Sequence, residues 1–146
     1  MFDTTFEDVI KIIQSWKPKR GHRREAHYRD DLLEYLRTEL NKPSPYDFGP
    51  RKKRVVQKET GPAVADIAVE GKIGIELKYN LNTAQGVRNL FGQIETYSRT
   101  YKDIIVVFCG KINEDKINDF ELKLSSLKPR STLMYEQRIK IIKKEK

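Results

Sequence analysis

The sequence predicts an α/β fold, a single domain spanning 1–146 in which a mixed central β-sheet is flanked by helices. A chain of 146 residues suffices for one hydrophobic core and is too short for two domains with a linker. Apolar residues recur every three or four positions in several segments and form short β-branched runs in others. The expected order is α, α, three strands, α, β, α, β, which favours helices packed on the faces of a sheet.

Two amphipathic helices are expected in the first third of the chain. The first follows the polar start Asp3-Thr4-Thr5 and ends before Pro18. Its apolar stripe consists of Phe6, Val9, Ile10, Ile13 and Trp16. The second helix is expected over 23–40, and its stripe consists of Tyr28, Leu32, Leu33, Leu36 and Leu40. Prolines and a glycine between 43 and 50 then predict a loop.

The rest of the chain predicts strands that alternate with helices. An extended segment near 55–59 is followed by a hairpin with strands at 63–69 and 73–78. Thr83 is expected to cap a helix that reaches about Tyr101. The remaining expected elements are a strand buried on both faces at 104–108, a helix from about 113, an extended stretch within 131–142 and a basic tail at 143–146.

Basic residues exceed acidic residues by 29 to 21, which gives a formal net charge of +8. Much of the excess lies in two runs, Lys17, Lys19, Arg20, Arg23, Arg24 and Arg51, Lys52, Lys53, Arg54. A single run is most simply a solvated surface, but two runs expected to flank a site favour a polyanionic partner. We therefore expect the basic residues of 19–24 and 51–54 to contact the phosphates of a nucleic acid.

Other protein classes fit the sequence poorly. No stretch is apolar enough to span a bilayer and the N-terminus lacks the order of a signal peptide, so we expect a cytoplasmic protein with no membrane partner. Cys109 is the single cysteine, which precludes an intrachain disulfide, and it is expected to be a buried core thiol. His22 and His27 have a poor ligand spacing and are expected to be exposed or to contact phosphate. Neither a Walker-type loop nor a Ser-His-Asp constellation is apparent.

The hairpin carries three charged residues whose relation follows from the length of its turn. If 70–72 is a three-residue loop with Gly71 in the left-handed conformation, opposing residue numbers sum to 142. Asp66 then stands opposite Glu76, and Lys78 lies on the same face as Glu76, about 7 Å along. A two-residue turn would shift the register by one and place Asp66 on the other face.

Two facing carboxylates repel each other within an otherwise apolar hairpin. A hard divalent cation such as Mg²⁺ offsets that cost while keeping positions for water and phosphate oxygens, and Mn²⁺ is the expected substitute. Lys78 could orient or deprotonate an attacking water, or stabilise charge on a phosphate. The alternative is that Asp66, Glu76 and Lys78 are surface charges on the solvent face, with Lys78 paired to a carboxylate.

Glu25 adds a carboxylate from a neighbouring element. At about 100° per residue, Leu32 and Leu36 fall roughly 20° either side of Glu25 on the second helix. Its ordinary role is a first-turn acid that complements the helix dipole. Its functional role would be a third acid that reaches the metal site.

These residues resemble the motifs of a known nuclease superfamily. The E, D and E-x-K motifs of the PD-(D/E)XK nucleases are matched by Glu25, Asp66 and the run Glu76-Leu77-Lys78. The expected element order resembles the αβββαβ core of the restriction-endonuclease-like fold. Gln93 and Tyr97 resemble the Q-x-x-x-Y motif of RecB-like members, and the match spans about 23–110. Ala65 stands where the family name has proline.

The resemblance implies phosphodiester hydrolysis with Mg²⁺. The metal would be held by Asp66, Glu76 and the backbone carbonyl of Leu77. Lys78 would position the water, and Glu25 would help to bind or orient a metal.

The helix after the E-x-K strand carries three further candidates. Gln93 would support the site or touch DNA. Tyr97 lies four residues later on the same helical face and is expected to be mostly core, with DNA contact as the alternative. Arg88 could bind phosphate or simply face solvent.

The leading hypothesis is a Mg²⁺-dependent deoxyribonuclease of the endonuclease, junction-resolvase or repair and recombination type, whose basic runs grip the DNA backbone. No added specificity domain is apparent, which favours structure-guided or nonspecific cutting. A homodimer would supply the two sites that duplex cleavage needs, although the sequence shows no interface. The alternatives are a non-catalytic nucleic-acid-binding protein on the same scaffold and a ribonuclease. The lack of an aromatic RNA-stacking motif ranks RNA below DNA.

Overall fold

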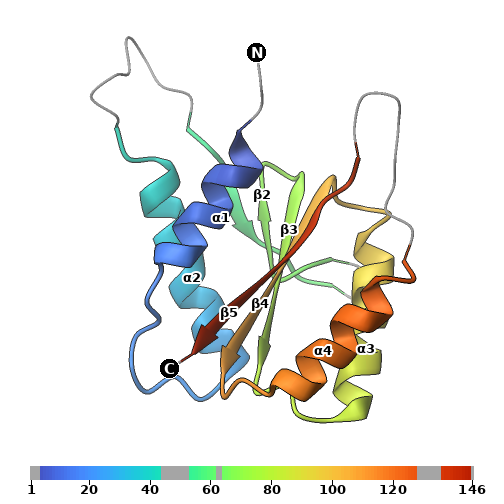
Figure 1. Cartoon of the computed structure of the whole chain (residues 1–146). Helices are drawn as coiled ribbons and strands as arrows, with labels where there is room; N and C mark the ends of the chain where they lie inside the picture. Colours follow the sequence, from blue (N-terminus) through green and yellow to red (C-terminus); the bar gives the residue numbers. More distant parts are fainter. Residues whose placement is uncertain (1–3, 44–52, 62–63, 128–135, 146) are drawn as a thin grey trace.

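The sheet has five strands with two helices on each face (Figure 1). This computed structural model describes residues 4–43, 53–61, 64–127 and 136–145. The helices are α1 (Thr5–Ser15), α2 (Glu25–Leu40), α3 (Ala84–Tyr97) and α4 (Glu114–Leu124). The strands are β1 (Val56–Lys58), β2 (Ile67–Val69), β3 (Ile73–Tyr79), β4 (Asp103–Gly110) and β5 (Ile139–Glu145), and they lie in that order across the sheet. The predicted α/β class and element order are confirmed.

The hairpin between β2 and β3 has the predicted register. Its pairs run from Ile67 opposite Ile75 to Val69 opposite Ile73, so opposing residue numbers sum to 142. Gly71 is left-handed at φ 65°, as expected for a three-residue loop, and Glu70 shares that conformation at φ 55°. The register that the site hypothesis required is therefore confirmed.

The other strands bring distant parts of the chain to one edge. The pairs β1–β2 and β2–β3 are antiparallel, whereas β3–β4 and β4–β5 are parallel. Tyr79, Cys109 and Lys144 consequently lie side by side where the three parallel strands end. We call this end of the sheet the carboxyl edge.

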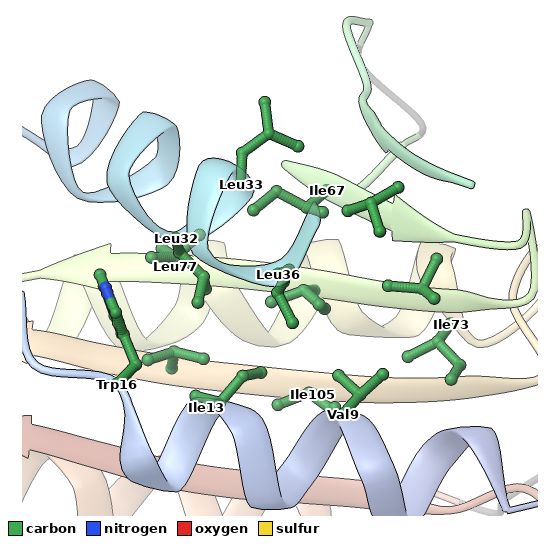
Figure 2. Close-up of a cluster of buried hydrophobic side chains, with 14 of the residues drawn as sticks. Val9, Ile13, Trp16, Leu32, Leu33, Leu36, Ile67, Ile73, Leu77 and Ile105 are labelled. Atoms are coloured by element: carbon green, nitrogen blue, oxygen red, sulfur yellow. The ribbon is translucent and has the colours of Figure 1, made fainter. Parts of the chain in front are cut away.

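The face under α1 and α2 carries an apolar core (Figure 2). The stripes predicted for both helices point into it, and Leu32 and Leu36 pack opposite Leu77 and Ile105 of the sheet. Trp16 follows the end of α1 and is also buried. Burial of large apolar side chains of this kind stabilises by about 1.5–3 kcal/mol each, so this face fixes the position of α2 on the sheet.

The face under α3 and α4 carries the second core. It contains Leu90, Ile94, Phe108 and Phe120, and every residue of β4 is buried, as the apolar run predicted. Thr83 caps α3 as predicted, because its hydroxyl accepts the Gly86 N–H at 2.9 Å. This core sets α3 against β3.

Several predicted boundaries are wrong. Helix α2 begins at Glu25 because Arg24 is extended, at φ −138° and ψ 147°. Helix α3 ends at Tyr97, four residues before the predicted end, and β2 is only three residues long. The expected basic tail belongs to β5, because β4 continues to Gly110 and supplies backbone partners for 143–145. The predictions for 3, 44–50, 63, 131–135 and 146 lie outside the described residues.

No helix in the described part of the chain combines the length and apolar composition needed to cross a membrane.

Candidate functional site

The two acids of the hairpin meet where β2 stops. Extending the β2–β3 register by one pair places Asp66 opposite Glu76. The chain has left the ladder there, since the Ala65 N–H donates to the Tyr101 hydroxyl at 3.0 Å. Asp66 Oδ2 instead accepts the Leu77 N–H at 2.9 Å, so a side-chain oxygen replaces the backbone partner that a longer β2 would offer. We call Asp66 and Glu76 the acid pair.

Glu25 occupies the next hydrogen-bonding position along the side of β3 that faces β2. Its Oε1 accepts the Tyr79 N–H at 3.0 Å. The N–H and C=O of one strand residue face the same neighbour, and residues two apart repeat this direction about 7 Å along. The Leu77 carbonyl therefore points to the side of β3 on which the carboxylates of Asp66 and Glu25 lie. The structure brings these groups to one edge, as the resemblance implied.

Glu76 is buried below this edge, with 3% of its surface exposed. Its Oε1 accepts the Tyr97 hydroxyl at 3.1 Å, and its Oε2 lies 3.4 Å from Lys78 Nζ. Burial, and then the Glu76 charge, raise the pKa of Tyr97 well above its usual range, so the phenol keeps its proton and remains a donor. Tyr97 is thus both a core residue, as predicted, and a direct partner of the acid pair.

The acid pair is held in a costly electrostatic state. Burial, reinforced by the facing charge of Asp66, raises the pKa of Glu76 to about 7. Burial also raises the pKa of Asp66, although the Leu77 N–H, Lys78 and Arg29 partly oppose it. Two desolvated carboxylates with too few donors leave the site deficient in positive charge. The solvent-face alternative for Glu76 is therefore wrong, although its pairing with Lys78 is present.

Gln93 lies one helical turn before Tyr97. Four residues of helix advance about 6 Å, and the two strand residues from Glu76 to Lys78 advance about 7 Å. Because α3 runs back along β3, Gln93 lies near the level of Lys78. Its Oε1 is buried and has no hydrogen-bond partner in the described part of the chain. A buried acceptor of this kind is poised for a donor from a ligand or a lysine.

Arg29 belongs to the site and was missed in the sequence. It is half-buried on α2, one turn after Glu25, and its charge lowers the pKa of Asp66 against the larger effect of burial. Its Nε also contacts Asp30 Oδ1 at 3.1 Å. The i, i+4 spacing from Glu25 was the signal that could have found it.

The described residues of the two basic runs lie at opposite ends of α2. Lys19, Arg20, Arg23 and Arg24 are exposed in the connection before Glu25, whose carboxylate contacts β3. Arg54 instead contacts Asp8 at 3.1 Å, and its carbonyl accepts the side chain of Asn41 just after α2 ends. A helix of 16 residues spans about 24 Å. The expectation that both runs flank one site is therefore wrong for Arg54 and its exposed neighbour Lys53, while Arg51 and Lys52 lie outside the described residues.

Four other residues considered in the sequence analysis have ordinary surroundings. Arg88 is exposed and contacts Gln85 Oε1 at 2.8 Å. The sequence predicts both histidines to be exposed or to contact phosphate. His22 is instead half-buried, with its Nε2 2.8 Å from Asp31 Oδ2, whereas His27 is exposed. Cys109 is buried as predicted, and burial raises the pKa of its thiol to about 12, so it is not a nucleophile at neutral pH.

The donor set at the acid pair fits a hard cation. Two carboxylates and a backbone carbonyl are oxygen ligands, and Mg²⁺ binds through one or two carboxylates while keeping water for the rest. Among the described residues no group of three or more His, Cys, Asp or Glu side chains is arranged to hold a metal ion. Searches of family models, curated proteins and solved structures found nothing that matches the chain.

Proposed function

We propose that the chain is a metal-dependent nuclease that hydrolyses the phosphodiester bonds of DNA. One observation carries this proposal, namely that Asp66 and Glu76 face each other while largely withdrawn from water. A protein that only needed a stable hairpin would do better with apolar residues at these positions. The pKa of Glu76, raised to about 7, is the expected signature of a site prepared for positive charge.

Mg²⁺ is the proposed cofactor, with Mn²⁺ as a substitute. Asp66, Glu76 and the Leu77 carbonyl would hold it, and Glu25 would orient the edge of β3 on which they lie. When bound, Mg²⁺ supplies Lewis-acid stabilisation of the negative charge that builds on a phosphate.

The chain supplies the remaining groups of the proposed site. Lys78 Nζ is 3.4 Å from Glu76 and so stands where it can hold a water or meet a phosphate oxygen. The Tyr97 hydroxyl fixes the orientation of Glu76. The buried Oε1 of Gln93 offers an acceptor near the level of Lys78. Arg29, with its delocalised charge, is suited to a phosphate oxygen beside Asp66.

A cleavage assay with four substrates tests the proposal. Supercoiled plasmid, linear duplex, single-stranded DNA and structured RNA are offered to the wild type and to Asp66→Ala, with Mg²⁺ or with chelator. We expect metal-dependent cutting of DNA by the wild type and none by Asp66→Ala.

The other possible outcomes would contradict the proposed site or favour one of the alternative functions. Metal-dependent cutting that persists in Asp66→Ala would overturn the site. Tight binding without cutting under Mg²⁺ or Mn²⁺ would favour the non-catalytic alternative, and cutting of RNA alone would favour a ribonuclease. Asp119→Ala is the matched control, because Asp119 is an exposed acid on α4 and its loss should leave cutting unchanged.

A further inference from the structure

A cavity with a charged lining opens at the carboxyl edge, on the face covered by α1 and α2. It has a volume of about 630 Å³ and is lined by 16–22, Tyr28, Lys143 and Lys144. Figure 1 shows why these segments meet, because the end of β5 lies beside the connection between α1 and α2. We call this cavity the basic pocket.

Its lining is strongly cationic. Lys17, Lys19 and Arg20 are exposed and make no ion pair with the rest of the described chain. Lys144 is half-buried, and its Nζ donates to the Gln14 carbonyl at 2.8 Å rather than to an acid. Burial, and then the nearby Lys17, lower the pKa of Lys144. Within the described residues, Lys143 alone of these cations has an acidic partner, Glu114.

The wall of the pocket is held by hydrogen bonds. Asp31 accepts the indole N–H of Trp16 at 3.2 Å, the Lys19 N–H at 2.8 Å and a contact from His22 Nε2 at 2.8 Å. Burial alone would raise the pKa of Asp31, but these contacts outweigh it and the pKa is lowered. Asp31 is therefore committed to the loop and does not pair with the exposed Lys17 and Lys19 side chains.

The pocket and the acid pair are connected through two stacked rings. Tyr28 lines the pocket and stacks on Tyr79, with ring centroids 5.4 Å apart and an interplanar angle of 30°. Tyr79 directly follows Lys78, and the Tyr79 N–H donates a hydrogen bond to Glu25 Oε1. A strand of nucleic acid that crosses the carboxyl edge can therefore contact both places.

We infer that the basic pocket binds phosphate groups of the nucleic-acid strand outside the segment that is cut. This inference rests on the proposed function, and it specifies where the substrate strand lies outside the acid pair. The exposed lysines and arginine of the pocket can each neutralise one phosphate of a nucleic-acid strand. Each neutralised phosphate releases bound counterions, and this release favours binding.

Binding without metal tests the inference independently of cutting. A fluorescein-labelled single-stranded oligodeoxynucleotide is titrated in chelator with the triple variant Lys17→Gln, Lys19→Gln, Arg20→Gln. We expect affinity to fall by about tenfold or more and the slope of log affinity against log salt to become shallower by about 2. The matched control removes three exposed lysines elsewhere, as Lys11→Gln, Lys123→Gln, Lys140→Gln, and should bind like the wild type.

The outcomes separate the two proposals and the source of the phosphate. Equal losses in both triple variants would overturn the pocket, even if Mg²⁺-dependent cutting is intact. A selective loss in the pocket variant, with no cutting by the wild type, would support the pocket and refute the nuclease. Competition by inorganic phosphate as strong as by the oligonucleotide would overturn the strand as ligand. Lys144→Gln should weaken binding in the same direction, and its thermal unfolding checks that it folds.

Discussion

The acid pair and Asp31 show two opposite ways of burying a carboxylate. Asp31 is met by three donors, and its pKa falls despite burial. Glu76 is met by one phenol, one lysine and another acid, and burial raises its pKa to about 7. The first arrangement stabilises the loop that carries it, whereas the second favours the uptake of a proton or a cation. A buried carboxylate that lacks hydrogen-bond donors and cations is therefore a better indicator of a functional site than one whose partners are complete.

The largest expected effect is on cutting. Glu76→Gln keeps the shape of the side chain but removes the charge of a proposed metal ligand, so we expect the rate to fall at least about 10³-fold, or about 4 kcal/mol. Single-turnover cleavage in Mg²⁺ measures this. A variant that keeps most of the wild-type rate would make Glu76 a purely structural acid.

The next effect separates stability from activity. Because folding raises the pKa of Glu76 from 4.5 to about 7, its contribution is fully present below about pH 4.5 and is lost as the pH rises to about 7. In chelator, Glu76→Gln should remove this loss and gain roughly 2–3 kcal/mol above pH 7. Urea unfolding at several pH values measures the difference. A parallel pH dependence in the two proteins would contradict it.

Asp31 should behave in the opposite way. Asp31→Asn leaves one acceptor oxygen for three donors, so we expect a loss of about 1–3 kcal/mol at neutral pH. The lowered pKa of Asp31 gives stability that is present at neutral pH and is lost as the pH falls through the folded-state pKa. Urea unfolding at neutral and acidic pH should show the variant approaching the wild type in acid. Equal stability at neutral pH would remove the contrast with Glu76.

The smallest effect concerns the phenol. Tyr97→Phe removes the hydroxyl that lowers the pKa of Glu76, so this pKa should rise further. Cutting should fall by about tenfold, because one hydrogen bond to a charged group contributes roughly 1.5 kcal/mol. The acid limb of the pH–rate profile should move to higher pH. A uniform loss with an unmoved profile would indicate that Tyr97 serves only packing.

Much of the fold could be predicted because its signals are local. The helical stripes, the Thr83 cap and the turn around Gly71 depend on residues close in sequence. The register of the hairpin followed from that turn, and with it the meeting of Asp66 and Glu76. These features need no knowledge of distant contacts.

The remaining features depend on contacts across the fold. Nothing near Glu25 indicates that it accepts a backbone N–H from β3, and nothing near Arg54 indicates that α2 separates it from the acid pair. The lysines at the chain end resembled a solvated tail because charge obscured their strand pairing. Charge patterns give the type of partner, but only the packed elements give its position.

The short β2 has a consequence for how the protein can change. Asp66 turns its carboxylate to Leu77 just where a longer strand would have continued the ladder. A β-branched residue at position 66 would favour a more complete sheet and a more stable hairpin, and it would remove the acid pair at the same time. Selection for stability alone would thus replace the acid pair. Retention of the acid pair in related sequences would therefore indicate selection for its chemical function.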